Sequence, residues 1–163
     1  MSERMKNLFR RLSKKRKQVA LVILWAALVA LVVIRMYWTA YNESARLSTF
    51  KIPFLGYEGP RPTVVDVSIV FVVGIIFGFV AYDVEDLLYG YIAAMLIAFI
   101  ISFAYVTLYI WYVLDLGKIF SVAAYDWEWA LYVAFSNVLV MMFPWIVGAC
   151  FLGLVIGSIV KTW

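Results

Sequence analysis

Few side chains in this sequence could perform polar chemistry inside an apolar environment, and the most notable of them precede a proline. Ser136 and Asn137 come about two turns before Pro144 in an uncharged stretch of 32 residues, 129–160. A proline breaks the hydrogen bonds of a helix, and broken helices with polar side chains form substrate sites in transporters. The sequence therefore offers a transport site here. The simpler interpretation is that these polar groups are satisfied within the helix or across to a neighbouring one.

A second candidate site is the acidic stretch formed by Asp83, Glu85 and Asp86. Carboxylate oxygens are suitable ligands for hard cations, so these residues could contact an ion. They lie between two apolar stretches rather than inside one, where water would solvate them. Asp86 would also stabilise the amino end of a following helix through the helix dipole. Solvated helix ends are therefore the competing interpretation.

Other chemistry is poorly supported by the residue types present. The sequence contains no His and a single Cys, Cys150, within an apolar stretch. His is the commonest zinc and haem ligand and the usual general base, and a thiol in apolar surroundings stays protonated. The sequence also has no glycine-rich phosphate loop. We therefore expect no catalytic site, no cofactor and no metal.

The elements that must position these residues are membrane-spanning helices. Hydrophobic residues make up 66% of the chain and charged residues 15%, whereas soluble domains average roughly 45–50% and about 25%. Crossing a bilayer takes ~20 predominantly apolar residues. The sequence predicts an all-α integral membrane protein whose domain, 19–163, is a four-helix bundle. Its expected spans are about 19–41, 63–82, 87–114 and 129–160.

The first 18 residues form a separate basic tail, with eight Lys and Arg against Glu3 alone. Apolar residues recur there with helical spacing, which predicts an amphipathic helix on anionic lipid headgroups. It could instead only fix the topology, or dock on a cytoplasmic partner. Nucleic-acid binding is not favoured, because Phe9 is the only ring available for stacking on bases. The residues expected at the membrane surface are Arg10, Arg11, Lys14, Lys15, Arg16 and Lys17.

The distribution of Lys and Arg also predicts an orientation. With the tail in the cytoplasm, four spans leave nine Lys and Arg inside and five outside, as the positive-inside rule favours. Both termini are then cytoplasmic. The expected location is the plasma membrane of a prokaryotic cell.

Small residues recur at one-turn spacing in two of the expected spans. They are Gly74 and Gly78 in one, and Ala149, Gly153 and Gly157 in the other. Such residues let helix backbones approach closely in lipid, either within the bundle or against another subunit. The resulting hypothesis is a non-catalytic accessory subunit of a larger membrane complex. The alternative is a small oligomeric channel or transporter that uses Asn137 and Pro144.

Overall fold

The computed structural model describes residues 3–47, 60–80, 84–113 and 126–162, and side chains in a somewhat narrower part of these ranges. The described ranges are helical apart from the short segment 60–63, and they contain no strand. The all-α prediction is therefore confirmed for them. The elements are α1 (Glu3–Leu47), α2 (Val64–Val80), α3 (Val84–Leu108), the π-helical turn η2 (Tyr109–Val113), α5 (Asp126–Met141), the π-helical turn η4 (Met142–Ile146) and α6 (Val147–Thr162).

Three helical stretches are long and apolar enough to cross a membrane, namely Arg16–Asn42, Leu87–Tyr112 and Ala130–Lys161. The fourth apolar helix, α2, is shorter, with 17 residues. At 1.5 Å per residue it is about 26 Å long, slightly less than a ~30 Å hydrocarbon core. The expected span 63–82 therefore corresponds to the shortest of the four apolar segments.

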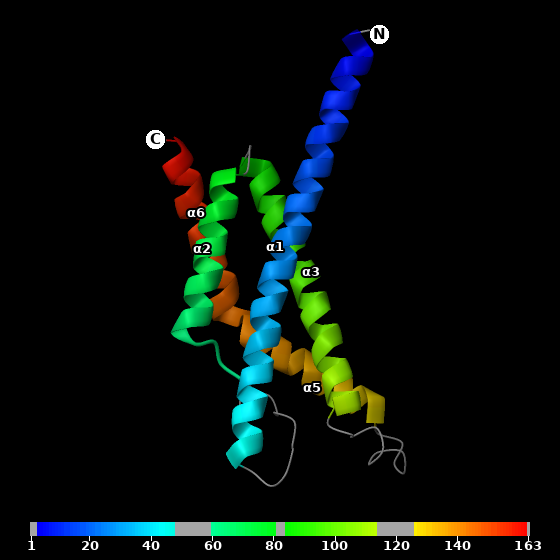
Figure 1. Cartoon of the computed structure of the whole chain (residues 1–163), viewed down its shortest axis with the longest axis vertical. Coiled ribbons are helices and arrows are strands. Elements are labelled where there is room, and N and C mark those ends of the chain that lie inside the picture. The colour runs from blue at the N-terminus through cyan, green and yellow to red at the C-terminus, as the bar shows by residue number, and fades with distance from the viewer. Residues whose placement is uncertain (1–2, 48–59, 81–83, 114–125, 163) are drawn as a thin grey trace.

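Helix α1 is the longest element, with 45 residues in one uninterrupted helix. It is rich in Ala, Leu, Arg and Lys, which have high helix propensity, and it contains neither Gly nor Pro. The expected division after residue 18 between tail and span does not coincide with a break in the helix. The amino-terminal part of α1 extends beyond the other helices, as Figure 1 shows.

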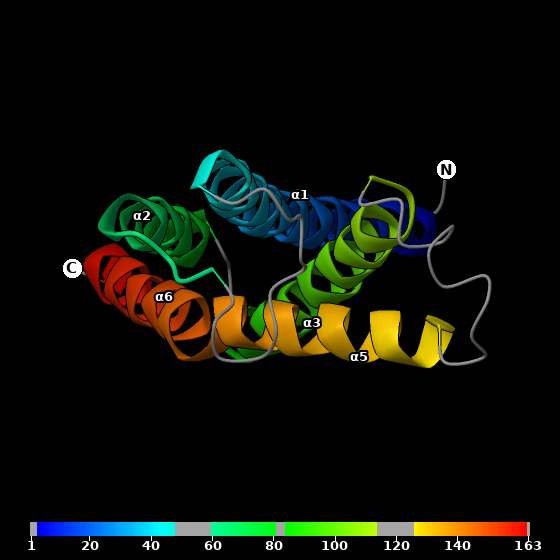
Figure 2. The same cartoon turned by 90° about the horizontal axis from the view of Figure 1, so that it is seen from below.

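The helices form two close pairs. Helix α2 packs along α6, and α1 packs along α3 (Figure 1). Contacts between α1 and α2 are sparser. Helix α5 lies across the bundle and packs on α3, and Figure 2 shows it along one edge of the bundle. The backbones of α2 and α6 approach each other more closely than those of α1 and α3.

The last apolar stretch is two helices rather than one. Phe143 has φ −106° and ψ 137°, outside the helical region, so α5 and α6 meet at a kink. The Phe143–Pro144 peptide bond is cis. Pro144 lacks an N–H and cannot continue the hydrogen bonds of α5, which accounts for the bend expected at this position. The kink lets α6 follow α2 while α5 turns towards α3.

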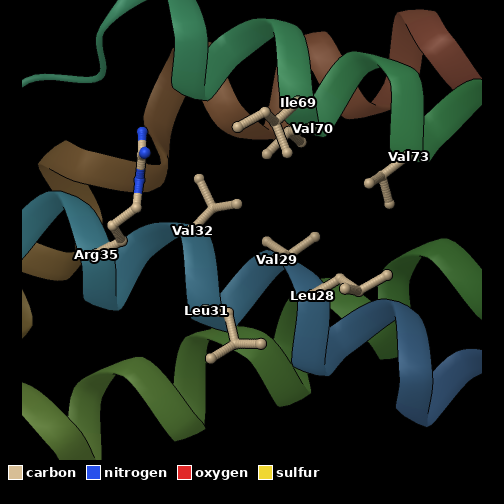
Figure 3. Close-up of a pocket in the computed structure, with 8 residues that line it drawn as sticks. All are labelled: Leu28, Val29, Leu31, Val32, Arg35, Ile69, Val70 and Val73. Carbon is tan, nitrogen blue, oxygen red and sulfur yellow. The ribbon is translucent and has the colours of Figure 1, made fainter.

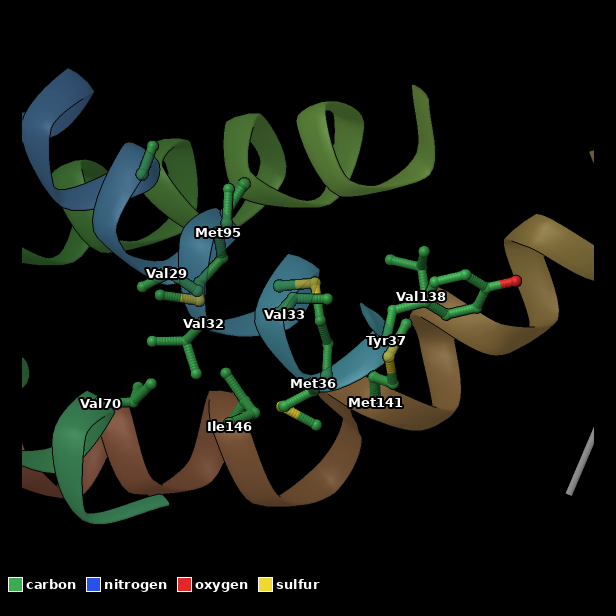
Figure 4. Packing of buried hydrophobic residues seen from close by; sticks show 14 of the residues in the cluster. Val29, Val32, Val33, Met36, Tyr37, Val70, Met95, Val138, Met141 and Ile146 are labelled. Atoms are coloured by element: carbon green, nitrogen blue, oxygen red, sulfur yellow. The ribbon is translucent and has the colours of Figure 1, made fainter. Parts of the chain in front are cut away.

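The apolar core lies where α1 meets the other helices. Figure 4 shows Val33, Met36 and Tyr37 of α1 facing Met141 at the end of α5 and Ile146 at the end of η4. All five side chains are buried. The residues recur on α1 at helical spacing, so one face of α1 forms the centre of the core and the opposite face is exposed. Helix α1 therefore contributes central side chains of the core.

Candidate functional site

The most unusual side-chain arrangement is an ion pair between two apolar helices. Arg35 of α1 donates from Nη2 to Oδ1 of Asp66, in the first turn of α2, at 2.6 Å. The Asp66 side chain is 3% exposed, whereas that of Arg35 is 54% exposed. Burying a carboxylate is unfavourable unless it is paired and hydrogen-bonded. Asp66 is therefore held between the helices, and the guanidinium is the part of the pair that faces outwards.

The start of α2 explains why Asp66 points towards its own helix end. Thr63 donates to Oδ2 of Asp66 from its backbone N–H at 3.0 Å and from its hydroxyl at 2.6 Å. The Thr63 Oγ1 in turn accepts from the Asp66 backbone N–H at 3.3 Å. This reciprocal pattern is a capping box, which satisfies donors that a helix start would otherwise leave unpaired. It orients the carboxylate so that Oδ1 remains for Arg35.

A groove with a volume of about 190 Å³ lies beside the ion pair, between α1 and α2. Apart from Arg35 at one end, its walls are apolar (Figure 3). The lining residues are Leu28, Val29, Leu31, Val32 and Arg35 from α1, and Ile69, Val70 and Val73 from α2. The groove thus combines one exposed cation with apolar walls that run along the two helices.

In the pair α2–α6, by contrast, glycines bring the two backbones into contact. A Cβ added at any of four glycines would overlap a carbonyl oxygen of the opposite helix. The glycine–carbonyl partners are Gly74 with Cys150, Gly78 with Leu154, Gly153 with Phe71, and Gly157 with Ile75. Ala149 lies one turn before Gly153 and is half-buried. In this chain the small residues of α2 and α6 face each other.

Aromatic side chains also join α1 to α2 and α3, and α3 to α6. Trp25 of α1 stacks on Phe77 of α2, with ring centroids 4.8 Å apart. Tyr91 of α3 contacts Trp25 and donates from its hydroxyl to the Val147 carbonyl oxygen at the start of α6, at 2.9 Å. Offset or tilted ring pairs add to the free energy gained from apolar burial. These contacts connect α1, α2, α3 and α6, and Phe77 lies in the last turn of α2, whereas Asp66 lies in the first.

The predicted transport residues lie in different surroundings. Asn137 is fully buried in α5 and Ser136 is half-buried, whereas Pro144 is exposed in η4. The groove described above is lined by α1 and α2 and does not include them. A transport site at Ser136, Asn137 and Pro144 stays a prediction.

The charged residues predicted to bind ions or lipids fall largely at the edge of what the structure describes. Asp83 lies outside the described residues, and Glu85 and Asp86 are in the first turn of α3 with side chains outside them. Arg16 and Lys17 are exposed on α1. Arg10, Arg11, Lys14 and Lys15 belong to α1, but their side chains are also outside the described part. Within that part, no group of three or more acidic or Cys side chains could hold a metal ion.

Neither Asp66 nor Arg35 was singled out from the sequence as a candidate site residue. The two residues, 31 positions apart, form one pair, and Asp66 is buried. The signal that could have found it is the Thr63–Asp66 spacing of a capping box. A charge inside each of two neighbouring apolar stretches is the second signal.

Comparison with known protein families, with curated proteins and with solved structures finds no match for this chain.

Proposed function

We propose that this chain is a non-catalytic subunit of a larger membrane complex. The observation that carries the proposal is an exposed aromatic stripe on α5. Tyr132, Phe135 and Leu139 recur at i, i+3 and i+7 and are all exposed, Tyr132 to 70%. Phe143, just beyond α5, is exposed as well. Tyr and Phe are enriched in protein interfaces, so this stripe has the composition of a docking face for another membrane subunit.

The position of α5 supports the same proposal. Because the chain bends at Phe143, α5 leaves the α2–α6 pair and contacts mainly α3. Phe135 reaches Phe99 and Phe103 of α3 at the edge of the stripe, with ring centroids 5.5 and 6.4 Å apart. Tyr132 and Leu139 remain exposed in the described part of the chain. A partner helix packed there would cover the stripe.

The proposed topology has four spans with both termini in the cytoplasm of a prokaryotic cell. The amino-terminal part of α1 and the end of α6 lie at the same end of the bundle in Figure 1, as an even number of spans requires. The Lys and Arg excess of the first 18 residues supports assigning that end to the cytoplasm. The basic tail would then meet anionic lipids of the inner leaflet.

The test is purification of the tagged full chain from its native membrane in a mild detergent, followed by quantification of co-purifying chains. We expect one or more unrelated membrane proteins in a fixed ratio, and a loss of that ratio in the double variant Tyr132→Ala/Leu139→Ala. The matched control is Tyr89→Ala, because Tyr89 is equally exposed but lies on α3. A pure homo-oligomer, or equal losses in both variants, would contradict the proposal.

A small oligomeric channel or transporter is the second candidate, and the break between α5 and α6 is the observation that favours it. Discontinuous helices place backbone groups and half-helix ends where an ion or substrate can bind. Asn137, two turns before the break, is the buried amide in that helix. If the candidate is correct, the purified chain moves ions or solutes across liposome membranes and Asn137→Leu abolishes the flux. Unchanged flux in Asn137→Leu removes this site.

A further inference from the structure

We infer that the α1–α2 groove holds a phospholipid, with its phosphate on Arg35 and one acyl chain along the apolar walls. This lipid site lies at the end of the groove that carries Arg35. It is separate from the lipid contacts expected of the basic tail, residues 1–18. The inference relies on the proposed membrane placement, but it needs no other subunit. It can therefore fail or succeed independently of the proposed complex.

The charge exposed at the groove is positive although Arg35 is paired. Both oxygens of Asp66 are occupied, Oδ1 by Arg35 and Oδ2 by Thr63, and the carboxylate is buried. The guanidinium has five N–H donors, and among the described residues its hydrogen-bond partner is Asp66. Its remaining donors lie on a half-exposed side chain. A phosphate oxygen is a strong acceptor for such donors, and Arg is well suited to bind it.

The length of α2 places Arg35 near one boundary of the hydrocarbon core. A helix of about 26 Å crosses a ~30 Å core only if both its ends lie near the boundaries. Asp66 is in the first turn of α2, and Arg35 is bonded to it. Exposed Trp38, one turn further along α1, is a residue type typical of the headgroup level. The guanidinium therefore lies within reach of the phosphates of one leaflet.

The groove runs from this boundary towards the centre of the membrane. Its α1 wall extends from Arg35 back to Leu28, seven residues or about 10 Å along the helix. Ile69, Val70 and Val73 form the α2 wall over the same stretch (Figure 3). A cavity without partner atoms loses dispersion contacts on every wall. An acyl chain would restore them, and a lipid anchored at Arg35 presents its chain in the correct direction.

The same geometry argues against other occupants. A soluble anion would use the guanidinium but leave the apolar walls uncovered. A lipid without a phosphate would fill the walls but would offer no anionic oxygen to the exposed donors of Arg35. A phospholipid satisfies both parts.

The experiment is native mass spectrometry of the purified full chain in detergent, titrated with phosphatidylglycerol. We expect one lipid to remain at a collision energy that removes the others. Diacylglycerol has the chains without the phosphate, and glycerol 3-phosphate has the phosphate without the chains. Each should bind at least about tenfold more weakly, because one set of contacts is lost. Equal binding of either compound would overturn the inference.

Two neighbouring valines provide a matched pair of variants. Val73 lines the groove, whereas Val72 is exposed on another face of α2 and does not line it. Val73→Phe fills the groove and should lower the retained lipid about tenfold or more, while Val72→Phe should retain it as the unmodified chain does. Equal retention in the two variants would show that the lipid lies elsewhere.

Two further variants keep the test decisive if Val73→Phe does not fold. Ile69→Phe fills the same groove from a more exposed position. The double variant Arg35→Gln/Asp66→Asn removes both charges together, so no buried charge is left without its partner. Both should lose the retained lipid while the helical circular dichroism is unchanged. A well-folded double variant that still retains phosphatidylglycerol would exclude Arg35 as the phosphate ligand.

Discussion

The two faces of α2 show two different ways of joining helices in an apolar bundle. The face towards α6 includes Gly74 and Gly78, which bring the backbones into contact. The face towards α1 is joined at one end by the Arg35–Asp66 pair and leaves a groove of about 190 Å³. Close packing without side chains gives a fixed interface. An ion pair beside larger side chains gives an interface that can accommodate a further molecule.

The difference follows from the residues that each neighbouring helix supplies. Helix α6 presents Gly153 and Gly157 at the spacing that matches the glycines of α2, so the carbonyls of each helix fill the space above the glycines of the other. Helix α1 presents Leu28 and Val32, whose side chains keep its backbone away from α2. The two interfaces should therefore respond very differently to substitution.

The largest effect is expected at the glycine interface. In Gly153→Ala the new methyl group overlaps the Phe71 carbonyl oxygen, and a backbone atom cannot rotate away. We expect the free energy of unfolding to fall by about 3 kcal/mol, at the upper end of the range for overpacked sites. Denaturant titration of the purified protein, followed by circular dichroism, measures it.

The control for this prediction is Gly148→Ala. A Cβ at Gly148 meets nothing within 4 Å, and Ala favours a helix over Gly by about 1 kcal/mol. This variant should be as stable as the unmodified protein or more so. Equal destabilisation at both positions would show that the α2–α6 backbones are not in contact as described.

A smaller effect is expected at the ion pair. Arg35→Gln leaves the Asp66 carboxylate buried with Thr63 alone, and a hydrogen bond between charged groups is lost. Because the Arg35 side chain is 54% exposed, solvent screens the pair. We therefore expect a loss of about 1.5 kcal/mol, at the lower end of the range for charged hydrogen bonds.

A double-mutant cycle with Asp66→Asn isolates the contribution of the pair. If the two side chains interact, the double variant loses less stability than the sum of the two single variants. Additive losses would mean that the two side chains do not interact in the membrane protein, and that the groove lacks its anchored cation.

The sequence was sufficient for the type of fold and for the small-residue spacing, because both depend on local patterns. A long apolar stretch predicts a helix, and glycines one turn apart lie on one helix face. The pairing of Arg35 with Asp66 depends on which helices become neighbours, and no local pattern encodes that. The direction of α5 was equally inaccessible. Pro144 predicts a bend, but the direction follows from the backbone angles at Phe143 and from packing on α3.

The smallest of the three effects is expected at Thr63. It distinguishes the stability contributed by the cap of α2 from that contributed by the ion pair. Thr63→Ala removes the hydroxyl that bonds to Asp66 and should lower the free energy of unfolding by about 1 kcal/mol, as loss of an N-cap does. Thr63→Ser retains the hydroxyl and should be nearly neutral. Because Thr63 orients Asp66, the alanine variant should also reduce the coupling measured between Arg35 and Asp66. Full coupling in Thr63→Ala would show that Arg35 alone positions the carboxylate, and that the capping box only starts α2.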